Sequence, residues 1–272
     1  MFMGSPGMVL PSLEALNKNH EICAIVTQED KPRGRGHQLL PTPVAVWGEK
    51  NGIDVVKPST LSEDSFLPVL EKYNPEIIVV IAYGKILPKY VLEFPPNKAV
   101  NVHFSLLPKY RGAAPVQYAI INGETETGVC TILMDEKLDT GDILHTIKAP
   151  ILEGETSGEL FSRLSKVCVK AITFTVENFS KLAHIKQNES KATYTEMLLP
   201  ANSFIDFSKS PEEIVNFIRG YNPHPTARMK VNDEILKVYS ARIKDDKLEI
   251  LEVMPPGKKR MLYVDYIRGK RI

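Results

Sequence analysis

With 272 residues, 43% hydrophobic and 25% charged, the chain has the composition of a globular protein long enough for two domains. A net charge of +1 excludes a uniformly basic nucleic-acid-binding protein. The longest apolar runs are far shorter than the ~20 residues of a membrane span, so no membrane segment is expected. The first residues lack a basic region followed by an apolar one, so no signal peptide is expected either. Cys23, Cys130 and Cys168 lack metal-ligand spacing and are expected to be buried, reduced thiols of a cytoplasmic protein.

The first part of the chain alternates between strand and helix patterns. Strands are predicted at residues 1–3, 21–27, 53–57, 77–82 and 99–103, and helices at 9–17 and 62–73. A further helix is predicted to begin at Pro43 behind a Thr42 cap. A loop rich in Pro, Gly and Arg is predicted at 28–41. This order predicts an α/β fold with a doubly wound, mostly parallel sheet and a ligand crevice at the carboxyl ends of its strands.

The remaining elements complete this sheet and add a second module. A helix is predicted at 115–122, strands at 128–134 and 142–151, and a long helix at 157–182. The polar stretch 187–194 resembles a linker, and Ser210 is expected to cap a helix at 211–219. Short strands at 229–231, 235–239, 248–253 and 261–264 predict a small C-terminal β-barrel or sandwich.

Three polar residues are candidates for chemistry. Asn101 and His103 lie two positions apart on one predicted strand, so their side chains share a face at its carboxyl end. Asp139, in the loop 135–142, is a candidate partner for His103. An amide donor stabilises an oxyanion, and an imidazole moves protons near neutral pH, as acyl transfer to an amine requires. From spacing alone, however, a single His at a strand end is more often a structural residue, and a single Asp in such a loop is more often a turn former.

Two segments concentrate positive charge in an otherwise balanced chain. One is the loop 31–37, and the other is the tail 257–272, which has many Lys and Arg residues and one Asp. Such patches bind polyanions even where the net charge is small. They are also typical of solvated loops, so they do not by themselves indicate nucleic-acid binding.

The run 101–108, N-V-H-F-S-L-L-P, resembles the N-x-H-x-S-L-L-P signature of the folate-dependent formyltransferases, and 138–142, L-D-T-G-D, resembles their second motif. Similar stretches at 2–6, 11–16, 27–36 and 257–271 extend the resemblance over nearly the whole chain. It implies a Rossmann-like catalytic domain at 1–183, a linker at 184–207 and an OB-like barrel at 208–272 that holds tRNA. It also implies transfer of the formyl group of 10-formyltetrahydrofolate to the amino group of methionyl initiator tRNA, by a monomer without a metal.

The resemblance assigns roles by position. Asn101, His103 and Asp139 match the family's catalytic residues. The implied folate contacts are Ser105, Leu106, Leu107, Pro108, Ala82, Tyr83, Gly84, Ile86 and Leu87, and the implied tRNA contacts are Arg33, Arg35, His37, Lys258, Lys259 and Arg260. Phe104 replaces the family's usual Gly and is expected to narrow the pocket mouth. The C-terminal domain is smaller than usual, so the resemblance carries more weight for the chemistry than for the affinity for tRNA.

Two alternatives remain at this point. The chain is a relative that formylates a small amine, such as an amino sugar nucleotide or a glycinamide ribonucleotide, or it is a non-catalytic RNA-binding protein with the same fold. The basic loop 33–37 and the basic tail favour tRNA over a small amine. The Asn–His–Asp trio favours an enzyme over a binding protein.

Overall fold

The computed structural model describes residues 1–33 and 38–270, except the side chains of Arg33 and Gln38. They form two compact units. Unit 1 comprises Met1–Pro108, Gly128–Ile147 and Leu164–Ala192, and unit 2 comprises Lys109–Thr127, Lys148–Arg163 and Thr193–Ile272. Cys23, Cys130 and Cys168 are free thiols, the last two buried. No helix in the described part of the chain has the length and apolarity needed to cross a bilayer.

A seven-stranded sheet forms the centre of unit 1, in the order β10-β9-β7-β6-β1-β2-β5. The strands are β1 (Phe2–Gly4), β2 (Ile25–Val26), β5 (Val55–Val56), β6 (Ile78–Ile81), β7 (Ala99–His103), β9 (Glu126–Leu133) and β10 (Ile143–Pro150). The pairs from β5 to β7 are parallel, whereas β7 and β9 are antiparallel. The predicted doubly wound, mostly parallel sheet is therefore confirmed.

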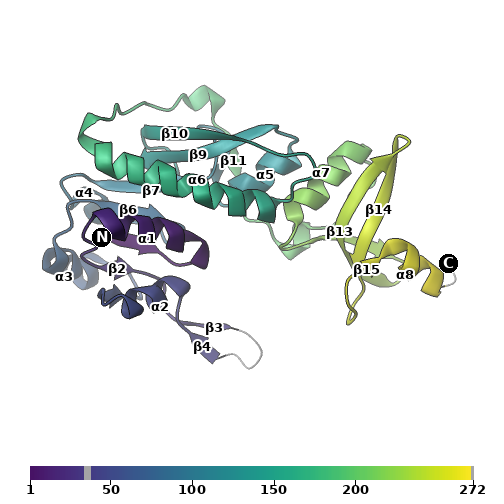
Figure 1. Ribbon diagram of the computed structural model, residues 1–272, viewed down its shortest axis with the longest axis horizontal. Helices are drawn as coiled ribbons and strands as arrows, with labels where there is room; N and C mark the ends of the chain where they lie inside the picture. The colour runs from purple at the N-terminus through teal and green to yellow at the C-terminus, as the bar shows by residue number, and fades with distance from the viewer. Residues whose placement is uncertain (34–37, 271–272) are drawn as a thin grey trace. The chain divides into compact units, whose positions relative to one another are not determined.

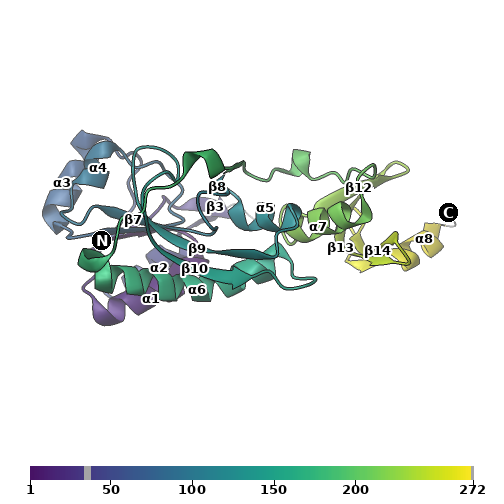
Figure 2. The same cartoon turned by 90° about the horizontal axis from the view of Figure 1, so that it is seen from above.

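Helices cover both faces of this sheet (Figures 1 and 2). On one face lie α1 (Leu10–Asn19), α2 (Pro43–Lys50) and α6 (Ser157–Asn178), and α1 is tied to α6 where Ser12 Oγ lies 3.4 Å from Cys168 Sγ. On the other lie α3 (Glu63–Tyr73) and the short α4 (Lys89–Glu93), whose apolar residues pack with Met3, Ile78 and Val80. This two-sided burial explains the continuous apolar run of β6.

Capping residues in the sequence predicted where helices begin more accurately than residue patterns predicted the short strands. Thr42 caps α2 by accepting a hydrogen bond from the amide of Ala45 at 3.1 Å, as predicted. The strand predicted at 21–27 is shorter, since β2 contains only two residues. The segment predicted as a loop at 28–41 contains a hairpin, β3 (Lys31–Arg33) and β4 (Gln38–Leu40). Leu39 is 68% exposed, so the hairpin lacks the buried apolar face by which a strand is recognised.

Unit 2 contains an antiparallel sheet, a helix that packs against this sheet, and a second helix that lies close to the first. The sheet order is β12 (Ala227–Val231), β13 (Glu234–Lys244), β14 (Lys247–Met254) and β15 (Met261–Leu262), where a barrel or sandwich was expected. Against it packs α7 (Pro211–Tyr221), which begins at a Ser210–Glu213 capping box and approaches α5 (Pro115–Ile121) closely at Gly220. The strand predicted at 261–264 is wrong beyond Leu262, because the chain turns into α8 (Tyr263–Lys270) to bury Tyr266.

The stretch predicted as a linker contains regular structure. It holds the 3₁₀ turns Glu189–Lys191 and Pro200–Asn202, and β11 (Tyr194–Thr195), which pairs in parallel with β8 (Arg111–Gly112). The strands are only two residues long, and a sequence of polar residues does not reveal such a pairing.

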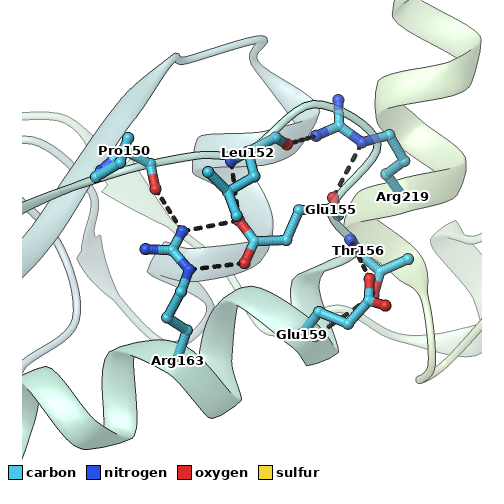
Figure 3. Close-up of polar contacts among 7 residues, drawn as sticks. All are labelled: Pro150, Leu152, Glu155, Thr156, Glu159, Arg163 and Arg219. Carbon is cyan, nitrogen blue, oxygen red and sulfur yellow. Dashed lines mark hydrogen bonds and ion pairs between the residues drawn. The ribbon is translucent and has the colours of Figure 1, made fainter.

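A hydrogen-bond network within unit 2 joins the segment before α6 to both α6 and α7 (Figure 3). Glu155 accepts two hydrogen bonds from Arg163, at 2.9 and 2.8 Å, and one from the amide of Leu152 at 3.0 Å. Arg219 of α7 donates to the carbonyls of Glu155 and Leu152 at 3.0 and 3.2 Å. Burial is the largest single influence on Glu155 and opposes its ionisation. The hydrogen bonds from Arg163 and the Leu152 amide, together with the charge of Arg163, outweigh it, so the pKa of this carboxyl is lowered.

Replacing Arg163 by Met should therefore destabilise unit 2. Glu155 is only 8% exposed, so we expect a loss of about 3 kcal/mol, the low end for breaking a buried pair because Arg163 is itself 30% exposed. The folded pKa of Glu155 lies below its ordinary value of 4.5, so its contribution is present above that pH and is lost as the pH falls through the folded pKa.

Urea denaturation followed by circular dichroism, from pH 7 to pH 3, measures both effects. Arg163→Met should flatten the acid-dependent loss of stability as well as lower stability at pH 7. The control is Glu159→Gln, because Glu159 caps the same turn through Thr156 at the surface. We expect it to cost less than about 1 kcal/mol. Equal losses for both variants would contradict the role given to Glu155.

Candidate active site

Asn101 and His103 lie at the carboxyl end of β7, on the face that carries α3 and α4. Ala99, two residues earlier on the same side of the strand, packs into the core with those helices. Asn101 pairs with Val80 of β6 and Ile132 of β9, and His103 pairs with Cys130. Asn101 is half-buried and His103 is 5% exposed. On this face of β7, the apolar core residue Ala99 is therefore followed by two polar side chains, Asn101 and His103.

The structure brings Asp139 to His103. The distance between His103 Nδ1 and Asp139 Oδ2 is 3.4 Å, and the two side chains are 6% and 9% exposed. This distance exceeds the ~2.7–2.9 Å of a tight charge-assisted hydrogen bond. The pair is shielded from water, so its electrostatic interaction is stronger than that of a surface pair.

Asp139 reaches His103 only because its loop folds back along β7. The antiparallel strand β9 ends at Leu133, opposite Val100, about 10 Å of strand away from His103. Residues 134–142 must cover that length. Two backbone features accompany the reversal: Asp139 has a φ of 55°, and Gly141 lies so close to Leu133 that an added Cβ would be 1.7 Å from its carbonyl oxygen.

Hydrogen bonds brace the loop from two directions. Within it, the Asp135 carboxylate accepts from the Thr140 hydroxyl at 2.6 Å and from the Lys137 amide at 3.1 Å. From outside it, Gln187 Nε2 donates to the carbonyls of Asp139 and Gly141, both at 2.8 Å. Sequence reasoning missed Gln187, because one Gln within a polar stretch carries no distinguishing signal.

The predicted segment after β6 divides into buried and exposed residues. Tyr83 and Leu87 are 1% and 4% exposed, whereas Ile86 is 86% exposed and Ala82 and Gly84 also reach solvent. The Tyr83 hydroxyl has no hydrogen-bond partner among the described residues, and burial raises its pKa to about 12, so the phenol stays protonated. Gly84 has a φ of 79°, a backbone conformation that favours glycine.

The segment after β7 is largely internal. Ser105 is fully buried, Leu107 is 8% exposed, and Leu106 and Pro108 are half-buried. Phe104 is 7% exposed, so its ring packs inside the protein and does not stand at the surface as a rim residue would. Any ligand contact of Ser105 therefore lies inside the protein.

The predicted tRNA contacts fall into two groups. Arg33 ends β3, but its side chain, like Arg35 and His37, lies outside the described part of the structure. Lys258, Lys259 and Arg260 are exposed between β14 and β15. Arg260 is engaged within unit 2, because it pairs with Glu252 and lies 4.6 Å from the centroid of the Tyr239 ring.

Unit 2 contains a buried cation that sequence reasoning missed. Arg111 is fully buried; its guanidinium donates to the Tyr194 hydroxyl at 3.1 Å and lies 5.8 Å from the centroid of that ring. The pair joins β8 and β11 by side chains as well as by backbone. Among residues 1–33 and 38–270, no cluster of three or more His, Cys, Asp or Glu side chains has the arrangement of a metal site.

Comparison with known proteins identifies similar chains. The family model described as "Formyl transferase" matches residues 3–176, and "Formyl transferase, C-terminal domain" matches 197–249. Among curated relatives, "Methionyl-tRNA formyltransferase" of Clostridioides difficile is 38% identical, covering 100% of this chain and 97% of the relative. The protein of that name from Moorella thermoacetica is 40% identical, covering 99% of this chain and 95% of the relative.

Solved structures share the fold at lower identity. An N-formyltransferase from Helicobacter canadensis, in complex with folinic acid and dTDP-3-aminofucose, has a TM-score of 0.71 at 21% identity, covering 96% of this chain and 97% of its own. A methionyl-tRNA formyltransferase from Clostridium thermocellum has a TM-score of 0.63 at 21% identity, covering 93% and 96%. At such identities the structures establish the fold alone.

Gly141→Ala should disrupt the candidate site. An added methyl group meets the Leu133 carbonyl oxygen, so the loop must move and Asp139 with it. We expect kcat to fall by about 100-fold or more and stability to fall by about 1–3 kcal/mol. Steady-state formyl transfer and thermal denaturation measure the two effects.

Gly154→Ala is the matched control, because Gly154 also has an unusual φ (71°) but open space around its Cβ position. This variant should lose some stability and keep its kcat. Near-normal turnover of Gly141→Ala would show that the loop geometry does not matter for activity.

Proposed function

We propose that this chain, which belongs to the formyl transferase family, transfers the formyl group of 10-formyltetrahydrofolate to the amino group of methionyl initiator tRNA. The observation that carries the proposal is the shielded His103–Asp139 pair, 3.4 Å apart, beside Asn101 on the same strand face. The acceptor is inferred from relatives named for it, which are 38–40% identical and align with nearly the whole chain.

In the proposed reaction, the lone pair of the acceptor nitrogen attacks the formyl carbon and the carbonyl electrons move to oxygen. The Asn101 amide donates a hydrogen bond to this oxyanion, which stabilises the charge as it forms. The attacking nitrogen must then lose a proton and the leaving N10 must gain one. His103, oriented by Asp139, accepts the first and supplies the second as the carbon–N10 bond breaks.

The donor is proposed to lie beside the segments that follow β6 and β7. Ile86, Ala82 and Gly84 offer exposed surface there, and the buried Tyr83 phenol is a hydrogen-bond donor without a partner in the described chain. Half-buried Leu106 and Pro108 offer further apolar contacts. A flat, partly polar ring system suits such a mixture of apolar surface and a few donors.

The tRNA is proposed to contact the basic loop 33–37 and Lys258 and Lys259, which are exposed. Arg260 is a weaker candidate than the sequence suggested, because Glu252 already neutralises it. An amino sugar nucleotide stays the alternative acceptor, since a structural neighbour binds one. The domain limits 1–183, 184–207 and 208–272, the cytoplasmic location and the monomeric state are proposed from the resemblance.

His103→Ala should lower kcat by about 10²–10⁴-fold, because it removes the group that moves both protons. The experiment assays formyl transfer from 10-formyltetrahydrofolate to charged initiator tRNA, free methionine and an amino sugar nucleotide in parallel. His184→Ala, at an exposed histidine of the same unit, is the control and should keep full activity. Wild-type turnover by the His103 variant would refute the mechanism, and a preference for the sugar nucleotide would refute the acceptor.

Use of tRNA should weaken steeply as salt is added, because binding of phosphates by Lys releases counterions. The double variant Lys258→Ala, Lys259→Ala should raise KM for tRNA. It should also make the plot of log affinity for tRNA against log salt concentration less steep, by about 1 in slope for each lysine that binds a phosphate in the wild type. The control is Lys18→Ala, at an exposed lysine of α1, which should change neither KM for tRNA nor the salt slope. A slope near zero for the wild type would point to a small acceptor.

A further inference from the structure

Gln187 is set apart from its surroundings by burial. Every other residue from 183 to 191 is exposed, whereas Gln187 is half-buried. The segment is anchored next to it by a two-way backbone bridge: Ile143 donates to the carbonyl of Ile185 at 2.8 Å, and Ile185 donates back at 3.0 Å. The bridge sets the segment beside the start of β10, so Gln187 is delivered to the end of the loop 134–142.

The carboxamide of Gln187 uses its two N–H groups on two carbonyls of that loop. Nε2 lies 2.8 Å from the oxygen of Asp139 and 2.8 Å from that of Gly141. These partners are 48 and 46 residues away in the sequence. A single nitrogen thus holds the backbone of Asp139, whose carboxylate faces His103, and that of Gly141, which lies against Leu133.

The loop needs such a restraint for two reasons. Asp139 adopts a positive φ that is sparsely populated by residues other than glycine, so the surrounding structure has to maintain it. The Asp139 carboxylate must also point back at His103 from a loop that leaves β9 at the other end of β7. The internal bonds of Asp135 hold residues 137 and 140, but Gln187 holds residue 139 itself.

We propose that Gln187 is a positioning residue for formyl transfer, which holds the backbone of Asp139 so that its carboxylate orients His103. The inference rests on the proposed function for its kinetic test and on the loop geometry for its spectroscopic test. In this role the effect of Gln187 on the reaction passes through Asp139.

Three variants of similar size separate hydrogen bonding from packing. Gln187→Met keeps the volume and removes both donors, Gln187→Lys keeps donors, and Gln187→Glu places a carboxylate against two carbonyl oxygens. We expect kcat to fall by about 10–100-fold for Met, less for Lys and more for Glu, with KM for the folate unchanged in all three. Wild-type kcat in Gln187→Met would overturn the proposal.

A double-mutant cycle tests whether Gln187 acts through Asp139. In an Asp139→Ala background the carboxylate is gone but the backbone carbonyl remains, so Gln187→Met should change the residual kcat by less than about 2-fold. A decrease as large as in the wild-type background would mean that Gln187 acts independently, and the proposal would be wrong.

Nitrogen-15 spectra of histidine-labelled protein give a readout that needs no turnover. The His103 ring signals, assigned by their loss in His103→Gln, should report mainly the Nδ1–H tautomer in the wild type, because Nδ1 faces Asp139. Gln187→Met should give a mixture of the Nδ1–H and Nε2–H tautomers of His103. Gln187→Lys should restore part of the excess of the Nδ1–H tautomer. An unchanged tautomer would overturn the positioning role. If the wild type formylates no acceptor, the proposed function fails, and this spectrum still tests the role of Gln187.

Discussion

The geometry of the candidate site depends on one constraint, the antiparallel pairing of β9 with β7. This pairing places the end of β9 at the amino end of β7, while His103 lies at the carboxyl end. A parallel strand would deliver its following loop to the carboxyl edge directly. Here the segment 134–142 must return along the strand, and the positive φ of Asp139 and the close approach of Gly141 to Leu133 accompany this return.

Order-of-magnitude energies indicate how such a loop is maintained. A non-glycine residue at positive φ costs on the order of 1–3 kcal/mol. One hydrogen bond contributes about 0.5–1.5 kcal/mol net, so the two bonds from Gln187 are comparable to the strain at Asp139. The loop therefore keeps its form through bonds from a distant part of the chain as well as through the bonds of Asp135 within it.

The described residues also divide the proposed work between the two units. Unit 1 contains half-buried Asn101 and the shielded pair of His103 and Asp139, whose electrostatic interaction is strengthened by the low local dielectric. Unit 2 contains Lys258 and Lys259, which are exposed and suited to phosphates in solvent. A run of basic residues in the sequence does not always form a basic surface. In the run 258–260, the charge of Arg260 is paired with that of Glu252.

The sequence alone determined what depends on neighbouring residues. A period of two places Asn101 and His103 on one face, a continuous apolar run predicts the buried strand β6, and Thr42 and Ser210 begin their helices by local caps. Only the tertiary structure decided that Asp139 returns to His103, that Gln187 secures it, and that the tail forms α8. These features rest on contacts between residues tens of positions apart, and the periodicity and capping of a single segment carry no record of them.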